Sequence, residues 1–204
     1  WPRLKAAGLP FTLFVATGVI DRKVQGYMSW DQIRELKDSG VTIGSQTQSH
    51  PHMTTLDRQA LDRELADSNQ RFVEELGEKP SLFAYPYGEY SLMVRQAVAE
   101  AGFSAAFGQH SGVAYDGMDH FTLPRFALNE RYGGIDRFRL VTNALPLPVS
   151  DVLPKDTLLG ENPPAFGFTL DSSIGDPGSL SCFASSEGET HLEYLEQRVE
   201  GRLK

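Results

Sequence analysis

The sequence contains a single cysteine, Cys182, among its 204 residues. One thiol excludes a disulfide within the chain and any metal site built from several thiolates. The sequence also lacks an apolar run long enough for a transmembrane helix, and its first residues carry no signal-peptide pattern. It starts at Trp1 in what resembles the last turns of a helix ending at Gly8, so we expect an upstream segment.

Basic residues are also scarce. Lys and Arg number 19 against 27 Asp and Glu, which gives a net charge of −8 and a pI near 5.1. Binding to phosphate groups requires clustered Lys and Arg, so this balance argues against a nucleic acid or an anionic membrane as a partner. A neutral or cationic glycan is compatible with it. With 40% hydrophobic residues, the chain can bury one substantial core.

Strand and helix patterns alternate along the chain as far as about residue 142. Short apolar runs predict strands, and apolar residues at helical spacing, closed by glycines, predict helices. Such alternation is typical of parallel βαβ units and therefore of an α/β fold. The predicted strands cover residues 11–15, 41–43, 81–84, 103–107 and 121–126, and the predicted helices cover residues 29–40, 55–76, 91–101 and 135–142.

The pattern changes at a proline-rich stretch, residues 146–165, which cannot form a regular helix. We therefore predict an α/β domain over residues 1–145, a linker over the proline-rich stretch, and a β-rich region over residues 166–204. Short segments separated by Gly, Ser, Asp and Pro make this last region typical of antiparallel β structure. Its predicted strands are residues 166–170, 180–184, 191–196 and 198–203.

The densest cluster of chemically useful side chains follows the predicted strand 41–43. Residues 44–53, GSQTQSHPHM, bring together two imidazoles, two amides and three hydroxyls. The carboxyl ends of parallel strands are where α/β folds bind ligands, so we expect the active site here. Neutral imidazole suits a borderline metal ion, which makes His50 a candidate ligand. His52 is either a second ligand or a histidine at the surface or at a helix entry.

A second informative stretch follows the predicted strand 81–84. Tyr85, Pro86, Tyr87 and Gly88 combine two aromatic rings with residues typical of a turn. Aromatic rings stack on the apolar faces of sugars while their hydroxyls hydrogen-bond to sugar edges, so this stretch can form the wall of a sugar-binding groove. An ordinary strand-to-helix turn is the alternative.

These stretches resemble the polysaccharide deacetylase family, the carbohydrate esterases with a NodB-type domain. Residues 46–51, QTQSHP, match the family's His-Ser/Thr-x-x-His-Pro motif, with Gln46 in place of the first His. Residues 86–88, PYG, match its Arg-x-Pro-Tyr/Phe-Gly motif, with Ala84 in place of Arg. Arg125 resembles the arginine that contacts the family's catalytic aspartate, and a salt bridge at a strand end is the alternative interpretation.

The resemblance implies an incomplete (β/α) barrel, similar to a TIM barrel, that lacks its first strand in this chain and is followed by a small, sandwich-like β-rich region. It also implies a hydrolase of carbohydrate metabolism that removes N-acetyl groups from a polysaccharide by cleaving the carbon–nitrogen amide bond. The implied cofactor is a divalent metal, zinc or similar, and the implied partner is an N-acetylated glycan. The implied location is the cell envelope or the outside of the cytoplasm.

The same resemblance assigns roles to individual residues. His50 and Gln46 would bind the metal. Tyr87, through its backbone amide, and Arg125 would be catalytic. The substrate would be bound by Tyr85, Pro86, Tyr87 and Gly88.

Two family motifs have no match in residues 1–204. One is the Thr-Phe-Asp-Asp-Gly motif, which supplies the catalytic base and a metal-binding Asp, and the other is the Leu-x-His motif with the general-acid His. We therefore expect low metal occupancy and no deacetylase activity from this chain alone. One alternative is a catalytically silent carbohydrate-binding protein, which Gln46 favours. Another is that the β-rich region acts as an interaction module, with the barrel as its support.

Overall fold

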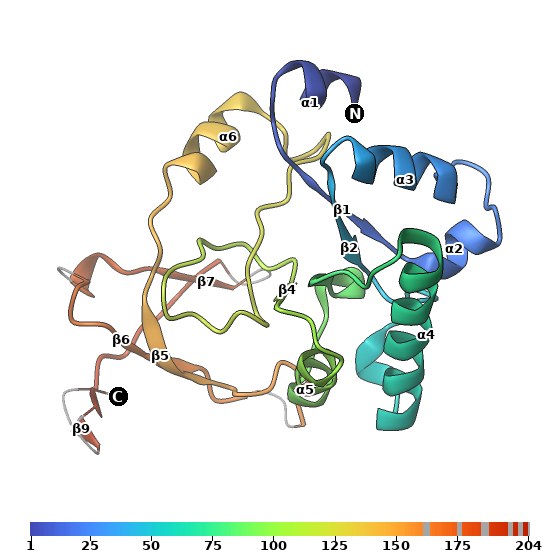
Figure 1. Cartoon of the computed structure of the whole chain (residues 1–204). Helices are drawn as coiled ribbons and strands as arrows, with labels where there is room; N and C mark the ends of the chain where they lie inside the picture. Colours follow the sequence, from blue (N-terminus) through green and yellow to red (C-terminus); the bar gives the residue numbers. More distant parts are fainter. Residues whose placement is uncertain (161–163, 175–176, 185–187, 196–197, 200–201, 204) are drawn as a thin grey trace. The chain divides into compact units, whose positions relative to one another are not determined.

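The computed structural model (Figure 1) describes residues 1–160, 164–174, 177–184, 188–195, 198–199 and 202–203. The chain divides into two compact units, Trp1–Asn143 and Ala144–Lys204. Among the described residues, no helix is long and apolar enough to cross a membrane.

The first unit is built on a four-stranded parallel sheet. Neighbouring strands in the sheet are also consecutive in the chain, which is the order found in a (β/α) barrel. The described residues form no closed barrel, so the predicted fold class, an incomplete (β/α) barrel, is confirmed. In the chain and across the sheet alike, the strands run in the order β1 (Thr12–Val15), β2 (Thr42–Ser45), β3 (Leu82–Ala84) and β4 (Ala105–Phe107).

Helices connect these strands, and their ends follow local signals. Ser29 and Gln32 form the predicted capping box at the start of α3, and Gly77, with φ +81°, ends α4 in the left-handed conformation that glycine tolerates. The elements are α1 (Pro2–Ala6), α2 (Thr17–Asp21), α3 (Trp30–Asp38), the 3₁₀ turn η1 (Met53–Thr55), α4 (Arg58–Leu76), the 3₁₀ turn η2 (Pro86–Gly88), α5 (Leu92–Glu100) and α6 (Ile135–Thr142).

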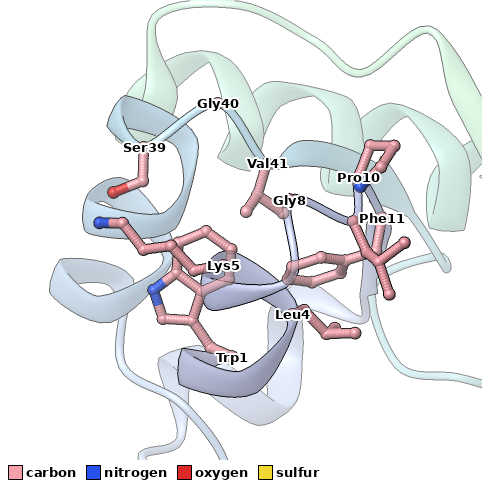
Figure 2. Close-up of a pocket in the computed structure, with 10 residues that line it drawn as sticks. Trp1, Leu4, Lys5, Gly8, Pro10, Phe11, Ser39, Gly40 and Val41 are labelled. Carbon is pink, nitrogen blue, oxygen red and sulfur yellow. The ribbon is translucent and has the colours of Figure 1, made fainter.

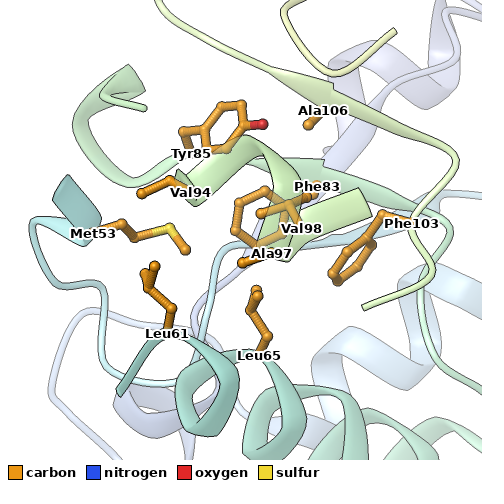
Figure 3. Packing of buried hydrophobic residues seen from close by; sticks show 10 residues of the cluster. All are labelled: Met53, Leu61, Leu65, Phe83, Tyr85, Val94, Ala97, Val98, Phe103 and Ala106. Atoms are coloured by element: carbon orange, nitrogen blue, oxygen red, sulfur yellow. The ribbon is translucent and has the colours of Figure 1, made fainter. Parts of the chain in front are cut away.

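The helices pack on one face of the sheet through two apolar clusters. The first joins β1 and β2 to α2, α3 and α4, where the ring of Trp30 lies edge-on to that of Phe72 with centroids 5.9 Å apart. The second cluster joins β3 and β4 to α4 and α5 and is fixed by ten buried residues (Figure 3). They are Met53, Leu61, Leu65, Phe83, Tyr85, Val94, Ala97, Val98, Phe103 and Ala106.

The opposite face of the sheet is curved. Phe14 on β1 and Phe107 on β4 belong to the two outer strands, yet their ring centroids are 5.7 Å apart. In a flat sheet these strands would be separated by three spacings of about 4.8 Å. Gly44 on β2 makes room for this contact, because a Cβ there would lie 2.4 Å from the Phe14 ring. The sheet therefore bends as in the wall of a barrel.

One predicted strand is wrong. Residues 121–126 form only an isolated parallel bridge, between Leu123 and Phe107 of β4. The Leu123 amide donates to the Ala106 carbonyl and its own carbonyl accepts from Gly108, at 3.0 and 2.9 Å. Two residues on, the Arg125 amide donates to the His110 carbonyl at 3.0 Å, so the segment stays beside the chain that follows β4 without forming a strand.

The described residues of the second unit form short antiparallel pairs and one 3₁₀ turn. β5 (Val149–Leu153) pairs with β6 (Gly167–Leu170), and β7 (Cys182–Ala184) pairs with β8 (Gly188–Thr190). The remaining elements are η3 (Pro177–Ser179) and the pair of β9 (Arg198–Val199) with β10 (Arg202–Leu203).

The proline-rich stretch predicted as a linker, residues 146–165, contains β5, and Pro148 and Pro154 lie just outside its ends. One predicted strand of this unit is wrong. Residues 191–195 are not a strand, and the strand in that part of the chain is β8, which precedes them. Residue 196, the end of the same prediction, lies outside the described residues.

A pocket of about 220 Å³ lies beside α1 in the first unit (Figure 2). Its wall includes Trp1 and Phe11, whose ring centroids are 5.5 Å apart, together with Lys5 and Val41. Phe11 and Val41 directly precede β1 and β2, so the pocket is at the amino ends of the strands. Sheets of this kind bind ligands at the carboxyl ends of their strands, so the candidate site is expected at the end of the sheet opposite this pocket.

Candidate functional site

Two loops at the carboxyl ends of adjacent strands carry the motif residues. Gln46, His50 and His52 follow β2, and Tyr87 follows β3. Because β2 and β3 are parallel neighbours, both loops leave the sheet at the same edge. The sheet therefore brings together two stretches that are separated in the sequence by the whole of α4.

The loop after β2 has an unusual backbone. Thr47 and His50 have φ values of +66° and +60°, in the left-handed region that residues with a side chain seldom adopt. The His50 amide donates a hydrogen bond to Oγ1 of Thr47 at 3.0 Å, which closes the turn between them. Backbone conformations of this kind persist only where the surrounding structure holds them.

Neighbouring elements supply that support. At the start of α2, the amides of Thr17 and Gly18 donate to the carbonyls of Thr47 and Gln48 at 3.2 and 2.8 Å. Gly18 permits this approach, since a Cβ there would lie 2.8 Å from the Gln48 carbonyl oxygen.

On α4, the carboxylate of Glu64 accepts three hydrogen bonds from the same loop. They come from the Gln48 amide at 3.1 Å, the Ser49 amide at 2.9 Å and the Ser49 hydroxyl at 2.6 Å. The backbone leading into His50 is thus held by both α2 and α4.

The loop after β3 starts in the core. Tyr85 is fully buried, its ring packs against Phe83 with centroids 5.4 Å apart, and its hydroxyl donates to the Phe121 carbonyl at 2.9 Å. Burial raises the pKa of Tyr85 above its ordinary value. Pro86 is buried as well. Neither side chain faces solvent, so Tyr85 and Pro86 offer no exposed surface to a sugar.

Tyr87 and Gly88 reach the surface. Tyr87 is 48% exposed and has φ +57°, and Gly88 has φ +75°. In the turn they form, the amides of Gly88 and Glu89 donate to the carbonyls of Tyr85 and Pro86. Within the part of the chain that the structure describes, the Tyr87 amide makes no such backbone hydrogen bond. The first amides of a helical turn have no partner within that turn, so the Tyr87 N–H can donate to a ligand.

The two loops meet at the Tyr87 ring. The ring of His50 stands edge-on to it with centroids 4.7 Å apart, and the ring of His52 is stacked on it with centroids 4.0 Å apart and planes 9° from parallel. Glu89 completes the cluster, since its Oε2 is 2.8 Å from Nδ1 of His52. His52 also precedes the first residue of η1, which agrees with the alternative of a helix-entry histidine.

The donors in this cluster do not complete a metal site. His50 and Gln46 are both half-buried in the loop after β2 and supply one imidazole nitrogen and one neutral amide oxygen. Catalytic zinc in proteins is held by three protein ligands. No group of three His, Cys, Asp or Glu residues that could hold a metal ion occurs in the part of the chain that the structure describes. The described residues alone therefore do not fit a bound divalent metal.

Arg125 lies beside the carboxyl end of β4. Its Nε donates to the Gly108 carbonyl at 2.7 Å, and its guanidinium lies 5.7 Å from the centroid of the Phe14 ring. Burial lowers the pKa of Arg125. None of the salt bridges between described residues includes Arg125, so the alternative of a salt bridge at a strand end is not seen there. A half-buried cation without a carboxylate partner is suited to binding an anion.

Two residues of this region were not singled out from the sequence. Glu64 lies on the polar side of an amphipathic helix, between Leu61 and Leu65, and nothing in that pattern separates it from other surface acids. Glu89 directly follows the Pro-Tyr-Gly turn, and this position next to a motif was the sign in the sequence that it could belong to the site.

The sequence model of the family described as "Polysaccharide deacetylase" matches residues 1–106. The protein named "Putative polysaccharide deacetylase YxkH", from Bacillus subtilis (strain 168), is 25% identical over 134 residues, which are 66% of this chain and 47% of that protein. The chain thus spans about half the length of this curated relative.

Solved structures resemble this chain in fold. The structure of IcaB from Ammonifex degensii has 26% sequence identity and a TM-score of 0.60, covering 69% of this chain and 64% of that one. The Streptococcus pyogenes deacetylase PplD, solved in complex with acetate, has 23% identity and a TM-score of 0.59, covering 61% of this chain and 55% of that one.

Proposed function

This chain belongs to the polysaccharide deacetylase family, and on that premise we propose that the natural protein, meaning residues 1–204 with any further segment it carries, hydrolyses N-acetyl amide bonds of a polysaccharide, releasing acetate and leaving an amine on the sugar. The observation that carries the proposal is the meeting of the two motif loops, with the rings of His50 and Tyr87 4.7 Å apart at the carboxyl ends of β2 and β3. In enzymes with (β/α) barrels, the catalytic residues lie at this carboxyl end of the strands.

Three groups have roles in this proposal. The exposed ring of Tyr87, followed by Gly88, provides a surface for the sugar. The Tyr87 amide donates a hydrogen bond to the oxygen on which negative charge develops as the carbonyl is attacked, and a fixed donor at that position lowers the barrier. Arg125 orients or stabilises a carboxylate at the carboxyl end of β4, as the family resemblance implies.

We also propose that the reaction depends on a divalent metal, with His50 and Gln46 among its ligands, because both residues fall on the family's metal-binding motif. Such an ion, if bound, would supply Lewis-acid polarisation of the N-acetyl carbonyl. With these two donors alone the affinity would be low, since a neutral amide oxygen is a weaker zinc ligand than imidazole. Because a metal would be bound weakly, we propose that residues 1–204 alone have little or no deacetylase activity. The proposed location, from family resemblance, is the cell envelope or outside the cytoplasm.

A catalytically silent carbohydrate-binding protein is the second candidate. The incomplete donor set around His50 and Gln46 favours it, since the aromatic surface at Tyr87 does not depend on that set. On this alternative, N-acetylglucosamine oligomers would bind without being hydrolysed.

Acetate release from N-acetylglucosamine oligomers separates the two candidates. We expect the natural protein, supplied with zinc or cobalt, to release acetate, and we expect His50→Ala to abolish this release. Residues 1–204 should bind the oligomer without releasing acetate. Binding without release by the natural protein would support the silent alternative. Acetate release at an enzymatic rate by residues 1–204 would refute the assignment of low activity to this chain.

A further inference from the structure

Tyr87 has a strained backbone at the point where the two motif loops meet. Its φ of +57° is unfavourable for a residue with a side chain, and Gly88 after it, with φ +75°, has no side chain to restrict the turn. A Cβ on Gly88 would lie 2.4 Å from Cβ of Gln109, so glycine is required there. Something outside the turn must therefore keep Tyr87 in this conformation.

The imidazole of His52 contacts both sides of this turn. Its face stacks on the Tyr87 ring at a centroid distance of 4.0 Å, and its Nδ1 is 2.8 Å from Oε2 of Glu89. Tyr87 and Glu89 are the residues immediately before and after Gly88. The His52 ring thus contacts the residues on both sides of Gly88.

His52 is itself firmly anchored. Its carbonyl accepts hydrogen bonds from the amide and the hydroxyl of Thr55, at 3.0 and 2.8 Å. The next residue, Met53, is fully buried in the cluster between α4, α5, β3 and β4. The backbone of His52 is therefore fixed next to the core, and its imidazole, 54% exposed, reaches from there to Tyr87.

We propose that His52 and Glu89 are positioning residues that fix the Tyr87 turn against His50. The Glu89 carboxylate orients the imidazole, and the imidazole holds the Tyr87 ring and hence its backbone amide. The expected effect on catalysis rests on the proposed deacetylase function, whereas the expected effect on the geometry of Tyr87 does not.

Nuclear Overhauser contacts between the His50 and Tyr87 rings test the geometry in residues 1–204. We expect His52→Ala and Glu89→Ala to lose or strongly weaken these contacts, and His52→Phe, which keeps a stacked ring, to retain them in part. Glu100→Ala is the matched control, because Glu100 is also an exposed, ion-paired carboxylate, with a side chain 50% exposed against 44% for Glu89. It should leave the contacts unchanged. If His52→Ala does not fold, Glu89→Gln provides the same test.

Acetate release by the natural protein tests the consequence. We expect Glu89→Ala to lower kcat about tenfold with little change in KM, because a displaced oxyanion donor weakens binding of the transition state more than binding of the sugar. Unchanged contacts between His50 and Tyr87 in both alanine variants would overturn the proposal. A lower kcat with unchanged contacts would overturn it as well, since His52 and Glu89 would then act on the reaction directly and not by positioning Tyr87. If the natural protein releases no acetate, the proposed function fails, while the ring contacts still decide the positioning role.

Discussion

Glu64 on α4 and Ser49 in the loop after β2 are joined by two hydrogen bonds: Ser49 donates from its amide to Oε2 at 2.9 Å and from its hydroxyl to Oε1 at 2.6 Å. A third bond to the same carboxylate comes from the Gln48 amide at 3.1 Å. These contacts make α4 a support for the candidate site as well as a layer of the core.

Glu64→Ala should lower the free energy of unfolding by about 1–2 kcal/mol, because hydrogen bonds to a charged group contribute more than neutral ones but this carboxylate is partly solvated. Urea denaturation measures the change. Asp62→Ala is the control on the same helix, since the exposed Asp62–Arg58 pair at 2.8 Å should contribute only about 0.3–0.5 kcal/mol. Equal effects of the two substitutions would show that Glu64 does not support the loop.

Asp21 should make stability depend on pH in the acid range. Burial by itself raises the pKa of Asp21, but hydrogen bonds from Arg71 and Trp30, at 3.0 and 2.8 Å, outweigh burial and lower it below the ordinary value of 3.8. A carboxylate with a lowered pKa stabilises the fold above its unfolded-state pKa, and this stabilisation is lost as the pH falls through the folded-state pKa.

We therefore expect Asp21→Asn to reduce the free energy of unfolding at pH 7 and to flatten its dependence on pH below about pH 4. Urea denaturation across that range provides the measurement. The matched control is Asp136→Asn, because the side chain of Asp136 is 95% exposed and its pair with Arg139 is 3.4 Å long. A pH profile of Asp21→Asn parallel to that of the unsubstituted chain would rule out this role for Asp21.

Metal binding should depend on His50 more than on His52. Only His50 falls on the family motif, and His52 already uses its Nδ1 in the contact with Glu89. Elemental analysis of the zinc-loaded natural protein should show less metal in His50→Ala and an unchanged amount in His52→Ala. Loss of metal in His52→Ala alone would mean that the motif was aligned to the wrong histidine.

Tyr85 and Tyr87 should respond in opposite ways to substitution. Tyr85→Phe removes the buried hydrogen bond to the Phe121 carbonyl and should lower the free energy of unfolding by about 1 kcal/mol. It should leave the affinity for N-acetylglucosamine oligomers unchanged, because the ring does not reach solvent.

Tyr87→Ala should instead weaken oligomer binding by about tenfold, or roughly 1.4 kcal/mol, through loss of the exposed ring. Isothermal titration calorimetry with thermal unfolding separates the two effects. Weaker binding by the Tyr85 variant at unchanged stability would contradict the position of Tyr85 in the core.

Local signals in the sequence were enough to predict most of the first unit. The start of α3 at Ser29 and Gln32 and the end of α4 at Gly77 are decided by residues within one helical turn, so they could be predicted without the fold. The order of strands and helices predicted the α/β class, and the residues around His50 and Tyr87 predicted the family. At residues 121–126 an apolar run predicted a strand, but only Leu123 pairs with β4, at an isolated bridge.

Alternation along β3 and the turn after it account for which of the two motif tyrosines faces solvent. Tyr85 and Tyr87 are two residues apart, yet one is buried and the other is 48% exposed. Tyr85 continues the alternation of β3 and shares the helix-covered face with Phe83, whereas Tyr87 follows the proline that begins the turn. Alternation from Phe83 could have predicted this outcome.

The partners that hold the candidate site could not be predicted in this way. Glu64 meets Ser49 across 15 positions of the chain, and Glu89 meets His52 across 37. Secondary-structure signals act over one or two turns, but these contacts depend on the parallel pairing of β2 and β3 and on the packing of α4 against them. The sequence by itself determined the elements and the motifs, and the folded sheet determined which side chains meet, because distant residues become neighbours only after the chain has packed.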